Sequence, residues 1–115
     1  PVPVHWRRRV KKPQNTVEVI ANGLHSTVRG RVILKPEILR ASRMTLKQGT
    51  LSPQKRCANV RDAFEVSQPE MVKGKKVLVV DDVMTTGATV HEIGNLLLKA
   101  QAQSVSVAVI CRAGD

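Results

Sequence analysis

Four consecutive apolar residues, Val77–Val80, are followed directly by two acids, Asp81 and Asp82, and then by the run TTGAT at 85–89. A strand that is apolar at successive positions is typical of a parallel sheet buried on both faces. Small residues and a glycine in front of a helix suit a turn whose backbone amides surround an anion. The segment therefore predicts an α/β fold with a ligand site at the carboxyl end of a central strand.

The residues after this segment complete a strand–helix–strand unit. A helix is predicted over 89–100, because Val90, Ile93 and Leu97 fall on one face, and a strand is predicted over 105–110. This order implies a right-handed crossover, and so a parallel sheet flanked by helices. No glycine occurs in 100–103, so the turn after the helix must close without the residue best suited to it.

The first half of the chain predicts shorter elements. Asn15 is placed to cap a helix with Glu18 three residues later, and that helix should end between Gly23 and Gly30. The other expected elements are the end of a strand at 1–4, a basic loop at 5–14, a strand at 31–35, edge pairing within 39–44, a polar loop at 45–58 with one helical turn after Pro53, and a strand or turn at 62–66.

Charge and composition limit the classes of function. The net charge is +10, and residues 1–56 hold 13 of the 19 Lys+Arg but 2 of the 9 Asp+Glu, which predicts an anionic partner on that side. Trp6 and Phe64 are the only aromatic residues, which argues against stacking on single-stranded nucleic acid. No apolar run approaches a membrane span, and Cys57 and Cys111 stand far apart. We therefore expect a single cytoplasmic domain over 1–115, with no membrane partner.

The acids and threonines together predict the kind of ligand. Asp81 and Asp82 can accept hydrogen bonds from vicinal ribose hydroxyls, or hold a divalent cation indirectly. The hydroxyls of Thr85, Thr86 and Thr89 can add donors to the phosphate oxygens that the turn amides bind. From the residues alone, the segment is a candidate site for a ribose 5-phosphate.

VLVVDDVMTTGAT also resembles the phosphoribosyl pyrophosphate (PRPP) motif of type I phosphoribosyltransferases. Three further stretches are similar to ComF-type (competence protein F) members of that family. They are Val2–Arg9 (VPVHWRRR), Arg43–Gln48 (RMTLKQ), and Arg56 with Asn59-Val60 and Ala63-Phe64. The resemblance implies a type I phosphoribosyltransferase core with a reduced or missing hood. It also leads us to expect that the N-terminal zinc-ribbon segment typical of full-length members is lacking.

The resemblance implies a role for each matching residue. Asp81 and Asp82 would be the catalytic acids facing the ribose, with Mg²⁺ held indirectly, and the segment 43–59 would be a flexible loop that closes over the reaction. The pyrophosphate would bind the loop after the first strand, where arginines offer forked donors. The implied substrate-binding residues are His5, Arg7, Arg8, Arg9, Arg43, Lys47, Val83, Met84, Thr85, Thr86, Gly87, Ala88 and Thr89.

The implied activity is transfer of the phosphoribosyl group from PRPP with release of pyrophosphate, and a homodimer would be compatible with it. The sequence leaves open a non-catalytic domain that senses PRPP or another nucleotide, and a DNA-uptake accessory that binds nucleic acid through its basic N-terminal half. A response-regulator acidic pocket is excluded, because that fold needs a phosphorylatable Asp on a later strand and only Asp115 follows the acid pair. The acceptor base or amine also stays open.

Overall fold

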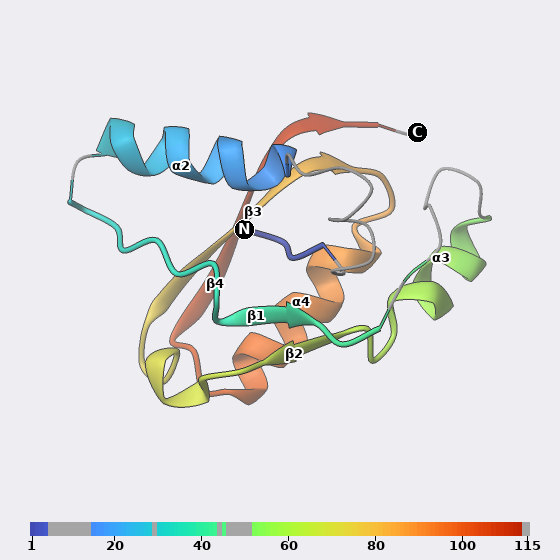
Figure 1. Cartoon of the computed structure of the whole chain (residues 1–115). Coiled ribbons are helices and arrows are strands. Elements are labelled where there is room, and N and C mark those ends of the chain that lie inside the picture. The colour runs from blue at the N-terminus through green and yellow to red at the C-terminus, as the bar shows by residue number, and fades with distance from the viewer. Residues whose placement is uncertain (5–14, 29, 44, 46–51, 114–115) are drawn as a thin grey trace.

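The computed structural model describes residues 1–4, 15–28, 30–43, 45 and 52–113. Its centre is a pair of parallel strands, β3 (Lys76–Met84) and β4 (Ser104–Arg112), joined by helix α4 (Ala88–Lys99) (Figure 1). The strands pair from Lys76 opposite Ser104 to Met84 opposite Arg112. The predicted strand–helix–strand unit and the α/β fold class are confirmed.

Strand β3 is longer than its apolar run predicts. Pairing with β4 continues through Asp81, which lies opposite Val109, and on to Met84. Val79, Val80 and Asp81 are buried at three successive positions, so both faces of the strand are covered there. The acid pair therefore lies inside the strand rather than after it, because the long partner strand keeps the ladder going past the last apolar residue.

Helix α2 (Thr16–Val28) packs against β3. Its start is the predicted one, since the Asn15 Oδ1 accepts a hydrogen bond from the Val17 amide at 3.1 Å. Val17 and Ala21 are the buried residues of the helix, and Gly30, with φ of 75°, follows its end. The helix thus ends between the two glycines, as predicted.

A small antiparallel sheet pairs β1 (Leu39–Ala41) with β2 (Phe64–Val66). Between them lies α3 (Pro53–Val60), which is longer than the single turn predicted after Pro53, and a short 3₁₀ helix, η2 (Pro69–Met71), follows β2. Helix α4 contacts β2, β4 and α3.

Two predicted strands of the first half are not formed. Residues 31–35 are not a strand: Ile33 is 82% exposed, and Pro36 has no amide hydrogen for a ladder. Pro1–Val4 is not assigned to a strand either, although the Val2 amide donates to the Val80 carbonyl at 2.8 Å and so holds this segment beside β3. Both predictions came from short apolar runs, whose pairing only the tertiary structure decides.

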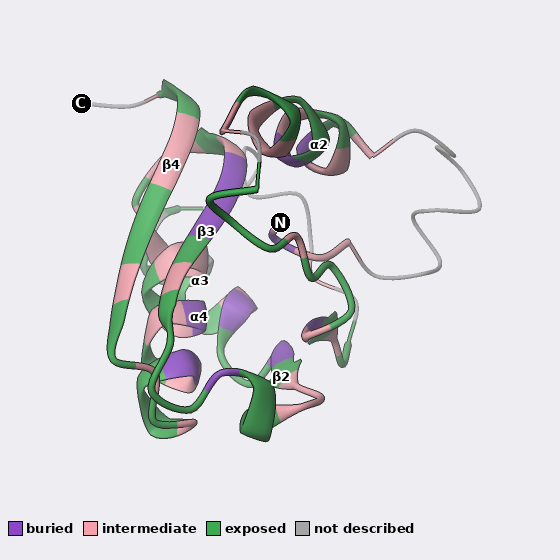
Figure 2. Cartoon of the chain, turned by 90° about the vertical axis from the view of Figure 1, so that its left-hand side faces the viewer, coloured by how far each residue is buried: buried purple, intermediate pink, exposed green. Residues whose placement is uncertain are grey.

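The core lies where α4 and α2 meet the strands (Figure 2). Its most deeply buried large side chains are Val72, Val79, Ile93 and Leu97. The turn that lacks a glycine is closed by Gln101, whose φ of 65° is left-handed and whose carbonyl accepts the Gly74 amide at 2.8 Å. A bond across two turns thus holds a conformation that the local sequence disfavours.

Candidate functional site

The turn between β3 and α4 has the geometry of an anion site. Gly87, at φ 78° and ψ 4°, is the N-cap residue of α4, and its carbonyl accepts the His91 amide at 2.9 Å. A left-handed residue here lets successive amides face one side, and the helix dipole adds partial positive charge. The Thr86 Oγ1 accepts a long hydrogen bond of 3.4 Å from the Ala88 amide. An anion that displaces this weak bond would gain a donor already in place.

Asp81 and Asp82 are each held by the amide of the following residue. The Asp81 Oδ1 accepts the Asp82 amide at 2.9 Å, and the Asp82 Oδ1 accepts the Val83 amide at 2.7 Å. Asp81 is only 9% exposed, and burial raises its pKa to about 6, with a further contribution from the charge of Asp82. The pair is therefore poised to gain from hydroxyl donors or from a cation that relieves the repulsion.

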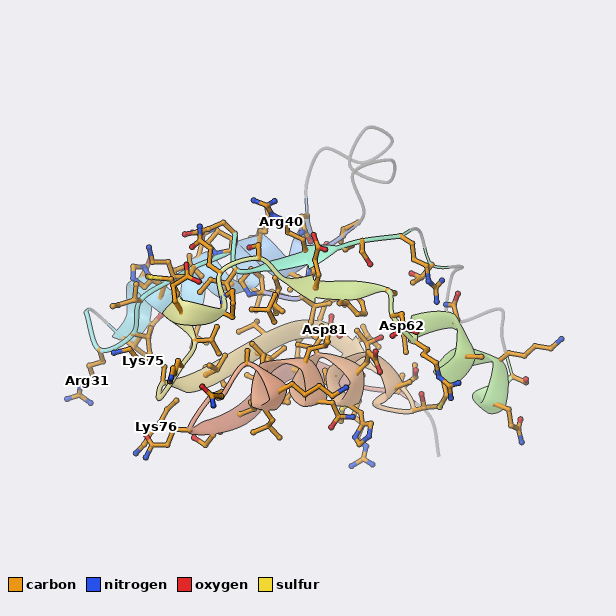
Figure 3. The ribbon with its side chains drawn as sticks, turned by 90° about the horizontal axis from the view of Figure 1, so that it is seen from below. Arg31, Arg40, Asp62, Lys75, Lys76 and Asp81 are labelled. Atoms are coloured by element: carbon orange, nitrogen blue, oxygen red, sulfur yellow. The ribbon has the colours of Figure 1, made fainter. Side chains whose placement is uncertain are left out.

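The other predicted residues of this segment occupy the same connection. Val83 is exposed at the end of β3, Met84 and Thr85 are half-buried, and Thr86 is exposed. Ala88 and Thr89 form the start of α4 and are half-buried. The structure thus brings the acid pair and the turn into one strand–helix connection. Figure 3 shows Asp81 well inside the molecule, whereas Lys75 and Lys76, at the start of β3, lie at its edge.

The Arg43 side chain contacts the end of α3. Its Nη2 donates to the Arg61 carbonyl at 2.5 Å and to the Ala58 carbonyl at 3.5 Å, both near the end of α3. These bonds satisfy carbonyls that a helix end leaves without partners. A contact of Arg43 with substrate stays a prediction. His5, Arg7, Arg8, Arg9 and Lys47 lie outside the described residues, as do residues 46–51 of the predicted flexible loop.

Sequence reasoning missed Glu92, whose Oε1 accepts a hydrogen bond from the Asp62 amide at 3.1 Å across 30 residues of chain. A glutamate on a helix is normally interpreted as a solvated charge, and no local pattern predicts this contact. Asp62 itself has a left-handed φ of 53°, which is uncommon for a residue other than glycine.

Within the described residues, no group of three or more His, Cys, Asp or Glu side chains is arranged to hold a metal ion. A cavity of about 350 Å³ is lined by Pro1, Glu18, Ala21, Asn22, Leu34, Pro36 and Glu37. None of the predicted site residues that the structure describes lines it. None of the described helices combines the length and apolar character needed to cross a bilayer.

Comparison with known proteins gives one family and several relatives. Residues 8–115 match the phosphoribosyl transferase domain. The chain is 35% identical over 108 residues to the DNA utilization protein YhgH of Escherichia coli K12, covering 94% of this chain and 44% of that protein. It is 30% identical over 115 residues to competence protein F of Haemophilus influenzae, covering 98% of this chain and 49% of that protein.

A shorter match joins the chain to the adenine phosphoribosyltransferase of Thermosynechococcus vestitus, with 38% identity over 55 residues, 48% of this chain and 32% of that enzyme. The chain spans about half the length of the curated relatives that it matches over most of its own residues. No solved structure matches it significantly. The resemblance to ComF-type proteins is confirmed by these relatives.

Proposed function

The chain belongs to the phosphoribosyl transferase domain family, and we propose that it binds PRPP at the β3–α4 connection and transfers the phosphoribosyl group. One observation carries this proposal. An acid pair, of which Asp81 is buried and Asp82 half-buried, and a helix N-terminus capped by Gly87 lie in one short connection, Asp81–Ala88. The hydroxyls of a ribose 5-phosphate can donate to the acid pair, and its phosphate can accept from the amides at the helix N-terminus. One small ligand can therefore satisfy both groups.

The chemistry is substitution at the anomeric carbon of the ribose. A nitrogen nucleophile forms a bond to that carbon while the bond to the pyrophosphate oxygen breaks, and pyrophosphate leaves with the electron pair. The transition state carries positive charge on the ring, so the enzyme has to position the reactants and exclude water. Asp81 and Asp82 would orient the ribose through its hydroxyls, and the turn amides would hold the 5-phosphate.

Mg²⁺ fits the acid pair as an indirectly held ion. Two neighbouring carboxylates, one of them desolvated enough to raise its pKa to about 6, repel each other until a cation or donor is near. A pair supplies fewer oxygens than the six that Mg²⁺ requires, so the ligand and water would provide the rest. When bound, the ion would offset charge on the pyrophosphate. Asp81 and Asp82 would then keep it beside the ribose.

Calorimetric titration with PRPP and with ribose 5-phosphate, with and without Mg²⁺, tests the proposal. We expect both ligands to bind wild type, and the Asp81→Asn/Asp82→Asn variant to lose at least tenfold in affinity, since hydrogen bonds to charged groups contribute roughly 1.5–3 kcal/mol each. Glu65→Gln removes an exposed charge on β2 and serves as the control. An unchanged affinity in the double variant would refute the assigned site.

A second candidate is a DNA-uptake accessory domain that recognises PRPP or a nucleotide without turnover. The relatives named for DNA utilization and competence favour it, together with the surplus of Lys and Arg in residues 1–56. Binding of duplex DNA with a steep salt dependence, and no release of pyrophosphate from PRPP, would favour this candidate over transfer. A cytoplasmic location belongs to both proposals, and the free, exposed Cys57 and Cys111 suit a reducing compartment.

A further inference from the structure

The peptide group between Arg61 and Asp62 is held from both sides by opposite charges. On one side the Arg43 Nη2 donates to the Arg61 carbonyl oxygen at 2.5 Å. On the other side the Asp62 amide donates to the Glu92 Oε1 at 3.1 Å. The carbonyl oxygen and the amide belong to one peptide group. Each charge-assisted hydrogen bond therefore polarises this group and strengthens the other hydrogen bond.

This peptide leads into a turn with a left-handed residue. Asp62 has a φ of 53°, a conformation that is uncommon outside glycine but that Asp adopts more readily than most residues. The Ser42 Oγ donates to the Asp62 carbonyl at 3.1 Å, and the Ser42 amide donates to the Ala63 carbonyl at 2.9 Å. Ala63, directly after the turn, is fully buried. The turn is therefore held both by a local bond, from the Ala63 amide to the Val60 carbonyl at 3.1 Å, and by the contacts from distant segments.

We call the two bonds to the Arg61–Asp62 peptide, from Arg43 and to Glu92, the clamp. The clamp connects helix α3 with helix α4. Glu92 lies four residues after Ala88, one helical turn from the start of α4, and so on the same side of the helix as Ala88. Arg43 follows β1 and reaches the end of α3, which packs against α4. In Figure 3, Asp62 lies on the same side of the view as Asp81 and away from Lys75 and Lys76. Through one peptide group, the clamp fixes α3 against the helix that begins at the phosphate turn.

We propose that Arg43 and Glu92 are positioning residues of the ribose-phosphate site, acting together through the Arg61–Asp62 peptide without touching the ligand. The proposal rests on the proposed function and departs from the substrate contact that the sequence predicts for Arg43. Among the described residues, the Arg43 side chain donates hydrogen bonds to carbonyls of α3 and its end. Its charge is therefore already used in holding that end.

A double-mutant cycle tests the proposal, with Arg43→Gln, Glu92→Leu and the two combined. We expect each single variant to weaken ribose 5-phosphate and PRPP equally, by about two- to thirtyfold, the range for residues that couple without ligand contact. The double variant should lose no more than either single one, since both changes release the same peptide. Glu92→Gln keeps an acceptor and should restore most of the affinity. Arg40→Gln and Glu70→Leu, both on exposed residues, should change nothing.

The amide resonance of Asp62 in a ¹⁵N-labelled sample reports the clamp independently of any ligand. It should shift upfield in Glu92→Leu, and also in Arg43→Gln, although Arg43 does not touch that amide. Losses of ligand affinity that add up in the double variant, or a loss of affinity in Arg43→Gln alone, would overturn the positioning role and make Arg43 a ligand contact. If the wild-type protein binds neither ligand, the proposed function is refuted and so is the positioning role. A shift of the Asp62 amide resonance in both variants would still show, in that case, that Arg43 and Glu92 hold this peptide group.

Discussion

Replacing Asp81 with Asn should stabilise the protein above pH 6 and leave its stability unchanged near pH 4. Asn keeps an Oδ1 that can accept the Asp82 amide, so the substitution removes the charge with little change of shape. Burial raises the pKa of Asp81 from 3.8 to about 6, so the folded protein holds this proton over a range in which the unfolded chain releases it. The native state then binds more protons than the unfolded one, and stability falls as the pH rises from about 4 to about 6.

The size of the effect follows from that difference. At about 1.4 kcal/mol per pKa unit, the shift from 3.8 to about 6 sets an upper bound of about 3 kcal/mol on the destabilisation by ionised Asp81, and screening by water lowers it. The new amide nitrogen lacks an assured partner, so we expect a gain of about 1–3 kcal/mol at pH 7.5. For a domain of this size, that is a rise of about 4–12 °C in Tm.

Thermal unfolding of wild type and Asp81→Asn, followed by circular dichroism from pH 4 to pH 8, measures this effect. The difference between the two proteins is the readout, because the titration of carboxyls that do not interact with Asp81 cancels in it and leaves Asp81 together with its neighbour Asp82. It should grow between pH 4 and pH 6 and then level off, whereas the exposed Glu65→Gln should give a flat difference. A difference for Asp81→Asn that does not vary with pH would refute the burial argument.

Two further predictions concern the anion side of the site. Gly87→Ala should lower stability by about 1–2 kcal/mol, because φ at 78° penalises a Cβ even though its nearest neighbours, the Met84 Sδ at 3.8 Å and the Val90 Cγ2 at 3.9 Å, leave room for one. Gly94→Ala, in the middle of the same helix with open space around the new Cβ, should instead raise stability by about 0.5–1 kcal/mol, and equal effects in urea unfolding would contradict the conformational argument. Changing Arg7, Arg8 and Arg9 to Gln should reduce PRPP affinity at least tenfold more than ribose 5-phosphate affinity, since only PRPP carries the pyrophosphate and charged hydrogen bonds to it contribute roughly 1.5–3 kcal/mol each. Parallel losses for the two ligands in calorimetry would argue against a pyrophosphate contact.

The strand–helix–strand unit could be predicted because each of its parts is encoded locally. Four apolar residues in a row predict a buried strand, which is correct for Val79 and Val80 but not for Leu78, which is 42% exposed, and the spacing of the apolar residues after Gly87 predicts a helix. Gly87 marks the sharp turn before that helix, since a left-handed φ there favours glycine. The candidate site could be proposed from the sequence for the same reason, because its acid pair and its turn are neighbours in sequence.

The short elements of the first half were harder to predict. The sequence 31–35 has the composition of a strand, but Ile33 is exposed, and whether a run of five residues pairs depends on a partner far along the chain. β1 does find a partner in β2, at a separation that no local pattern encodes.

The sequence by itself determined the family, the βαβ unit and the acid–turn segment, because these depend on neighbouring residues and on helix and strand periodicity. The tertiary structure decided how far β3 extends, which buried Asp81 inside the strand and raised its pKa. It also decided that Arg43 and Glu92 hold one peptide from opposite sides, across separations of 18 and 30 residues. Burial and contacts of this kind arise only when distant segments pack together, since a charged side chain looks the same in sequence whether it faces water or a peptide group.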